Sequence, residues 1–167
     1  KLIEDKNVDA IIFTFRNHVS SKSNPKMYGW VKTDHKNNAI GVSVKVPISK
    51  KTHQDHAIVG TFWFKKVEFF NQGLKSLIDK NIKINNEYYV DSLMGELINL
   101  GLHVKVFEVE NYLCWGTPND YETFIYWQSF FHKAQWHPYN LHKDVTVNKA
   151  KIEILEKKYT TFKQEHK

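Results

Sequence analysis

The chain has 167 residues, 41% of them hydrophobic and 25% charged, which is the composition of roughly one folded domain and excludes a mostly disordered chain. Its formal net charge is +6, yet Arg16 is the single arginine among 24 basic residues. Because proteins that read nucleic acids rely on arginine for bidentate base contacts, we interpret the excess lysine as solvated surface and expect no nucleic-acid partner.

The first half of the sequence predicts four strands. Asp9–Phe15 is a short apolar run rich in β-branched residues, which is typical of a buried strand, whereas the polar stretch Asn17–Lys26 predicts a loop. Met27–Thr33 and Ala39–Val46 flank a polar turn and predict a hairpin. Ala57–Phe64 is the strongest strand signal, and its interior glycine indicates either a bulge or the close approach of a ligand.

The second half alternates helices and strands. Lys66–Lys80 and Tyr89–Leu100 carry apolar residues at helical spacing, and Gly101 is suited to end the second helix. His103–Val109 alternates as a half-buried strand, and Tyr112–Trp115 predicts another short strand.

A third helix follows, with Thr117 as its N-cap and Pro118 in its first turn, and the sequence His137-Pro138-Tyr139 is expected to break it. A last, lysine-rich helix is expected over Val147–Phe162. This alternation predicts an α/β layered domain with a mixed sheet. Ligands of such sheets bind outside the carboxyl ends of strands, which points to the loops after residues 46, 64, 109 and 115.

Four motifs have residue types suited to ligand binding, and each also has a purely structural interpretation. Gly60 could admit a ligand to the strand or simply form a bulge. The stretch Asn85–Ser92 combines amides, carboxylates and tyrosines that suit a sugar, although Asp91 could instead cap a helix. The helix start near Thr117 could bind an anion or sugar, and Lys45 at a strand end could contact a phosphate or lie on the surface.

The metal-ligating residues form no familiar pattern. The histidine pairs His53/His56 and His132/His137 lack a third ligand at a familiar spacing. The single cysteine, Cys114, excludes an intrachain disulfide and favours a reducing, cytoplasmic compartment; pairing with a histidine as a nucleophile stays open. No apolar run reaches the ~18 residues of a membrane span, and no signal-peptide pattern is present, so we expect no membrane partner.

Five segments in this order resemble the C-terminal part of sugar-1-phosphate nucleotidylyltransferases, the glucose-1-phosphate thymidylyltransferase-like and mannose-1-phosphate guanylyltransferase-like enzymes. The resemblance spans about residues 9–128. The segments are Val44–Ser49, Asp55–Lys65, Asn85–Ser92, Val104–Val109 and Cys114–Tyr121.

The resemblance implies a Rossmann-like, three-layer α/β/α nucleotidyltransferase fold whose N-terminal part is absent. It implies a sugar-phosphate-binding region over residues 1–135 and an extension with a lysine-rich helix over 136–167. The implied reaction joins a nucleoside triphosphate to a sugar 1-phosphate and releases pyrophosphate with the help of Mg²⁺.

Residue by residue, Lys45 is similar to the family's sugar-phosphate lysine and is the expected catalytic residue. Glu87 and Asp91 are similar to its sugar-hydroxyl contacts. The expected substrate-binding residues are Gly60, Thr61, Glu87, Tyr89, Asp91, Trp115, Gly116 and Thr117.

Two departures from the family pattern bear on activity. The Gly-rich nucleotide-binding loop is absent, so we expect the isolated chain to be inactive. Cys114 stands where the family has a metal-binding aspartate, and a thiol is a poor ligand for Mg²⁺, which prefers hard oxygens.

The leading hypothesis is therefore part of a cytoplasmic nucleotidylyltransferase, expected to associate with itself or with a missing N-terminal half through an exposed sheet edge. The alternative is a non-catalytic, nucleotidyltransferase-like module that binds sugar phosphates or a partner subunit. A nucleic-acid-binding domain is suggested only by the net charge, and the scarcity of arginine argues against it.

Overall fold

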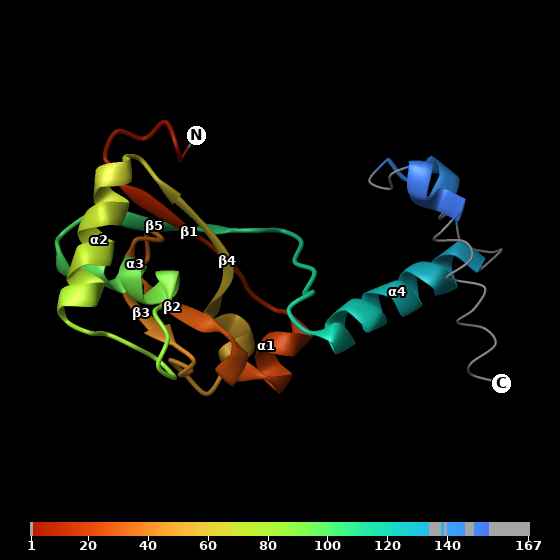
Figure 1. The fold of residues 1–167 in the computed structure, drawn as a ribbon, viewed down its shortest axis with the longest axis horizontal. Helices are drawn as coiled ribbons and strands as arrows, with labels where there is room; N and C mark the ends of the chain where they lie inside the picture. Colours follow the sequence, from red (N-terminus) through yellow and green to blue (C-terminus); the bar gives the residue numbers. More distant parts are fainter. Residues whose placement is uncertain (1, 134–137, 139, 146–148, 154–167) are drawn as a thin grey trace. The chain divides into compact units, whose positions relative to one another are not determined.

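The computed structural model describes residues 2–133, 138, 140–145 and 149–153 (Figure 1). The chain divides into two compact units, Lys1–Tyr112 and Leu113–Lys167. The first unit contains the sheet and the second contains a long helix. The domain boundary at 135/136 that the sequence suggests stays a prediction.

A five-stranded mixed sheet forms the centre of the first unit, with the strand order β3-β2-β4-β1-β5. β1 runs parallel to β5 and antiparallel to β4, so the predicted α/β class with a mixed sheet is confirmed. The strands are β1 (Ala10–Phe15), β2 (Gly29–Thr33), β3 (Ala39–Val44), β4 (His56–Phe64) and β5 (Val104–Glu108).

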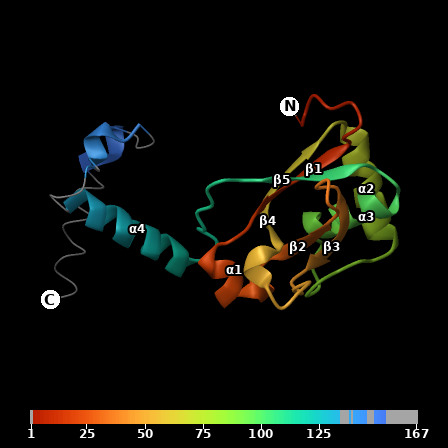
Figure 2. The same ribbon diagram turned by 180° about the vertical axis from the view of Figure 1, so that it is seen from behind.

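Two amphipathic helices, α2 (Val67–Asp79) and α3 (Val90–Asn99), lie on the same side of this sheet (Figures 1 and 2). Their apolar stripes supply Leu77, Leu93 and Leu97, which are almost completely buried against the strands. Burial of this kind stabilises a helix more than its intrinsic propensity does, so the periodic apolar spacing located both helices correctly.

The β2–β3 hairpin forms one edge of the sheet, with β3 outermost. It pairs with β4 only at Trp30 and Val31, and its turn then contacts β5, where Val106 N donates to Asn37 O at 3.1 Å. Asp34 shapes this turn, because its Oδ1 accepts the backbone N–H groups of residues 36 and 38. Along the hairpin, β3 packs against α3.

The polar stretch Asn17–Lys26 was expected to be a loop, and this expectation is wrong. It forms α1 (Val19–Ser23) and a 3₁₀ turn, Pro25–Met27. Two side-chain hydrogen bonds from the following residues hold it: Tyr28 Oη donates to Ser20 Oγ at 2.7 Å, and Trp30 Nε1 donates to the Pro25 carbonyl at 3.0 Å. Apolar periodicity cannot reveal a helix that polar contacts of this kind hold in place.

The second unit begins with an irregular segment. Tyr112–Trp115, for which the sequence predicts a strand, pairs with no strand among the described residues. The helix predicted next is present as α4 (Pro118–Lys133). The predicted break at residue 137 and most of the helix predicted over Val147–Phe162 fall outside the described residues.

Candidate functional site

Four of the predicted site residues meet where the β2–β3 hairpin faces the start of α3, and we call Lys45, Glu87, Tyr89 and Asp91 the Lys45 cluster. The Lys45 Nζ lies 5.6 Å from the centroid of the Tyr89 ring and donates a hydrogen bond to the Met27 carbonyl at 2.9 Å. The contact with Tyr89 has the geometry of a cation–π interaction. A cation is thus held at the edge of the hairpin, next to an aromatic ring.

The backbone at Lys45 is unusual, since its φ of 62° lies in the left-handed region. A lysine gains nothing sterically from that conformation, and glycine or asparagine is common there. The conformation ends β3 at Val44 and is held by a hydrogen bond from Lys45 N to the Tyr28 carbonyl at 3.0 Å. Strain kept at a charged residue supports a functional role for Lys45.

Asp91 presents its carboxylate to the start of β2. A Cβ built at Gly29 would lie 2.1 Å from Asp91 Oδ2, so the missing side chain at Gly29 provides the space for this carboxylate. Burial raises the pKa of the Asp91 carboxyl, and the nearby Lys45 charge works in the opposite direction. The sequence alone did not show that Gly29 serves Asp91 in this way.

The exposed Glu87 and the half-buried Tyr89 form the rim of the cluster. The Tyr89 hydroxyl donates to Glu87 Oε2 at 2.5 Å, and this bond is the main reason why the pKa of Tyr89 is raised. One cation, two carboxylates and one hydroxyl therefore face the same region. A lysine suits a phosphate, and carboxylates suit sugar hydroxyls.

Gly60 and Thr61 lie elsewhere in the first unit. The pairing of β1 with β4 shifts its register between Ile12 and Thr14, which leaves a bulge in β4. Gly60 and Thr61 belong to this bulge and are exposed. Gly60 has a φ of 97°, which explains why a glycine stands there. Within the described part of the chain, no hydrogen bond or ring contact joins either residue to the Lys45 cluster.

Trp115, Gly116 and Thr117 belong to the second unit, where they lead into α4. Thr117 is an N-cap: Asp120 Oδ2 accepts its backbone N–H at 3.1 Å and its hydroxyl at 2.8 Å, and Thr117 Oγ1 accepts the Asp120 N–H at 3.2 Å. Trp115 is exposed but packs against Phe124, with ring centroids 4.9 Å apart. The predicted cap is confirmed in its geometry, and substrate contact by this turn stays a prediction.

The metal-ligating side chains at this turn, Cys114 and Asp120, do not fit a magnesium ion. The Cys114 thiol faces Asp120 Oδ2 at 3.4 Å, and the same carboxylate oxygen already serves the helix cap. Mg²⁺ needs several hard oxygens in octahedral geometry. The described residues contain no group of three or more His, Cys, Asp or Glu side chains that could hold a metal ion.

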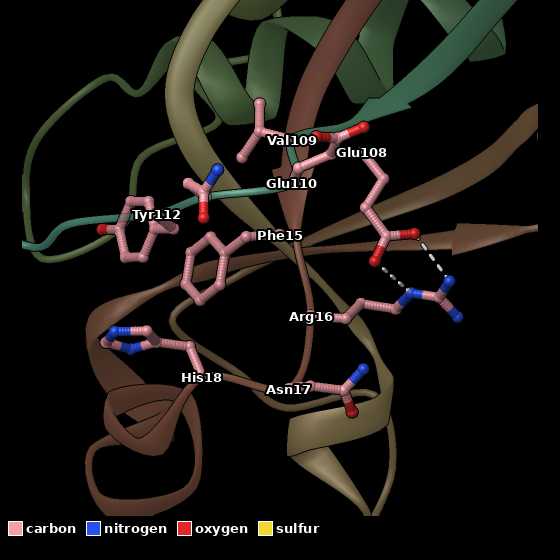
Figure 3. A pocket seen from close by; sticks show the side chains of 9 residues that line it. Phe15, Arg16, Asn17, His18, Glu108, Val109, Glu110 and Tyr112 are labelled. Carbon is pink, nitrogen blue, oxygen red and sulfur yellow. Dashed lines mark hydrogen bonds and ion pairs between the residues drawn. The ribbon is translucent and has the colours of Figure 1, made fainter.

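A cavity of about 590 Å³ opens at the carboxyl ends of the parallel strands β1 and β5 (Figure 3). We call it the β1–β5 pocket. The rule for α/β sheets pointed to the loop after residue 109, which does line it, but it did not reveal the residues after β1. The lining residues are Phe15, Arg16, Asn17, His18, Glu108, Val109, Glu110, Asn111 and Tyr112.

An ion pair joins the two strands at this pocket. Arg16 Nε and Nη2 donate to the two carboxylate oxygens of Glu108 at 3.0 and 2.6 Å, as Figure 3 shows. The bond from Arg16 lowers the pKa of Glu108. The only sequence signal for the Arg16–Glu108 pair was the solitary arginine directly after a strand.

A buried histidine lies on the neighbouring strand. His56 Nδ1 and Thr14 Oγ1 are hydrogen-bonded at 2.9 Å, and burial lowers the pKa of His56.

Comparison with known proteins supports the fold. No protein-family model and no curated protein match the sequence. A nucleoside-diphosphate-sugar pyrophosphorylase from Vibrio cholerae RC9 superimposes with a TM-score of 0.55 and 20% identity, over 70% of this chain and 46% of that one. The chain therefore has a nucleotidyltransferase-type fold.

A second solved structure, CMP:2-keto-3-deoxy-manno-octonic acid synthetase in complex with CTP, matches with a TM-score of 0.44 and 15% identity, over 72% of this chain and 49% of that one. The chain thus spans about half the length of either structure.

Among the described residues, no helix is both long and apolar enough to cross a membrane.

Proposed function

We propose that this chain is the sugar-phosphate-binding part of a nucleotidyltransferase that joins a nucleoside triphosphate to a sugar 1-phosphate and releases pyrophosphate. The proposal depends on one observation. Lys45, which stands in a strained backbone conformation, lies beside Tyr89 and near the Asp91 carboxylate. The nucleotidyltransferase-type fold supports the same reaction class.

In this proposal the Lys45 cluster binds and orients the sugar 1-phosphate. The Lys45 ammonium neutralises the phosphate, whose oxygen attacks the α-phosphorus of the nucleotide, while Glu87 and Asp91 accept hydrogen bonds from sugar hydroxyls. Most of the catalysis of phosphoryl transfer consists of such positioning and charge neutralisation. Nucleotide binding is assigned to a further part of the enzyme or to a partner, since the expected Gly-rich loop is absent from this sequence.

Calorimetric titration with glucose 1-phosphate and mannose 1-phosphate tests the binding step. We expect saturable binding that Lys45→Met weakens at least about tenfold, because a charge-assisted bond to phosphate contributes about 1.5–3 kcal/mol. Lys83→Met is the matched control, since the Lys83 Nζ lies 5.0 Å above the Tyr88 ring in a similar contact outside the cluster. Equal affinities for the two variants would contradict the assignment of Lys45.

The alternative is a module that binds sugar phosphates or a partner subunit without catalysing transfer. It is favoured by the Cys114–Asp120 contact, because a thiol and a carboxylate used for capping do not provide a magnesium site. Magnesium-dependent release of pyrophosphate by this chain, when it is supplied with a nucleoside triphosphate and a sugar 1-phosphate, would exclude the alternative.

A further inference from the structure

We propose that the β1–β5 pocket is a second ligand site, which takes a neutral polyhydroxylated molecule such as an unphosphorylated sugar. The pocket lies where two neighbouring parallel strands end, which is the usual position of ligands in α/β sheets. A cavity of about 590 Å³ is within the size range of small-molecule sites.

The charges that line the pocket disfavour an anion. The Arg16 guanidinium already donates two hydrogen bonds to Glu108, so the positive charge is compensated. Glu110 adds a second carboxylate to the lining. A phosphate or carboxylate ligand would therefore face one uncompensated carboxylate and no free cation among the lining residues, and the polar lining equally disfavours a purely apolar ligand.

The lining instead mixes donors with acceptors. His18 Nδ1 accepts the backbone N–H of Ser20 at 3.3 Å, so the neutral ring carries its proton on Nε2 and offers a donor. Asn17 and Asn111 each provide an amide with both functions, and Glu108 and Glu110 accept. A hydroxyl group both donates and accepts, so a polyol or sugar satisfies such a lining without bringing in a net charge.

An aromatic wall completes the site. Phe15 and Tyr112 stack with ring centroids 3.7 Å apart and an interplanar angle of 6°, and His18 meets both rings edge-on (Figure 3). This packing fixes the half-buried Tyr112 ring at the pocket, where it can contact the C–H face of a sugar.

The pocket is a different site from the Lys45 cluster, although the two are neighbours. Tyr28 stands between them: its carbonyl accepts the Lys45 N–H at 3.0 Å, and its ring lies 5.3 Å from Phe15. The proposal for the pocket therefore does not depend on the proposed function of the Lys45 cluster.

Saturation-transfer NMR on the full chain tests the proposal, with glucose, mannose and ribitol as neutral probes and methyl phosphate and spermidine as charged ones. We expect saturable binding of at least one neutral probe, weakened about three- to tenfold by Asn111→Ala and by Glu110→Ala, since each removes one hydrogen-bonding group. Both residues are exposed, so both variants should keep the fold, which their amide spectra will verify.

Lys45→Met serves as the control and should leave neutral-sugar binding unchanged. The proposal is overturned if no neutral probe binds saturably, if the pocket variants weaken the binding of methyl phosphate or spermidine instead, or if both pocket variants bind the neutral probes like the unmodified chain. Loss of sugar 1-phosphate binding in Lys45→Met, with neutral-sugar binding intact, would separate the pocket from the proposed function.

Discussion

Lys45 combines a charge suited to phosphate with a backbone conformation that costs stability. Its φ of 62° penalises any residue with a Cβ, by about 1 kcal/mol relative to glycine. We expect Lys45→Gly to be more stable than Lys45→Ala by about that amount, because both variants lose the lysine contacts but only alanine keeps the strain. Urea unfolding of the two variants measures the difference.

The same pair of variants checks the functional role of Lys45. Both should lose affinity for sugar 1-phosphates equally, because neither carries the ammonium group. If Lys45→Ala were as stable as Lys45→Gly, the left-handed conformation at this position would be wrong.

Gly29 and Asp91 form a second residue-scale test. A side chain at Gly29 would meet Asp91 Oδ2 at 2.1 Å and Ile58 Cδ1 at 2.9 Å, so Gly29→Ala should destabilise the protein by about 1–3 kcal/mol and displace the carboxylate. Gly41→Ala is the matched control in the same hairpin, since nothing lies within 4 Å of a Cβ there.

Thermal or urea unfolding of the two alanine variants makes the comparison. The Asp91→Ala background should reduce the cost of Gly29→Ala, because the closest clash is then removed. Equal costs for Gly29→Ala in both backgrounds would show that Asp91 does not occupy this space.

At the scale of the elements, α2 and α3 are joined by one buried carboxylate. Glu96 is 4% exposed and accepts hydrogen bonds from Ser76 at 2.6 Å, Lys80 at 2.5 Å and Asn99 at 2.9 Å. Burial alone would raise the pKa of Glu96, but these hydrogen bonds outweigh it and lower the pKa below its ordinary value of 4.5. The charged form therefore stabilises the packing of the two helices.

This carboxylate makes stability depend on pH. Because the folded-state pKa of Glu96 is lowered, its contribution is complete above about pH 4.5 and is lost as the pH falls through the folded-state pKa. Glu96→Gln should cost about 1–3 kcal/mol at neutral pH and progressively less in acid. Urea unfolding between about pH 3 and pH 7 measures the difference.

Asp79→Asn provides the comparison for Glu96→Gln. Asp79 forms an exposed pair with Lys75 at 2.8 Å on the same helix, so its loss should change stability little at any pH. A cost of Glu96→Gln that stays constant across the pH range would show that Glu96 is not bound as a carboxylate.

Periodicity and capping signals were sufficient to predict most elements, because strands and helices that bury apolar stripes show them in sequence. Tertiary contacts decided the remainder. α1 is held by a hydrogen bond from Tyr28, and the 3₁₀ turn after it is held by one from Trp30 of β2. Tyr112, expected in a strand, instead stacks on Phe15. No local pattern contains contacts of this kind.

The candidate site was predictable to a lesser degree. The residue types near Lys45 and near Asp91 suggested that each binds a ligand. Whether Lys45 and Asp91 belong to one site depends on how the hairpin packs against α3, and in the sequence only the resemblance to a family placed them in one site. The Arg16–Glu108 pair was missed, because the parallel pairing of β1 with β5 is not visible in either strand. Turn residues such as Thr117 were predictable, since a cap is a local interaction.

At the scale of the whole molecule, the chain has a nucleotidyltransferase-type fold and spans 46% of the pyrophosphorylase that it matches. Its sheet places two neighbouring groups of polar residues in the first unit, the Lys45 cluster and the β1–β5 pocket. The central claim is that the first of these binds a sugar 1-phosphate.

Titration of the isotope-labelled chain with glucose 1-phosphate and mannose 1-phosphate, followed by amide NMR, tests that claim most directly. The account predicts saturable shifts centred on Lys45, Glu87, Tyr89 and Asp91, and their loss in Lys45→Met. Saturable shifts centred elsewhere, or no binding of either sugar 1-phosphate, would contradict it.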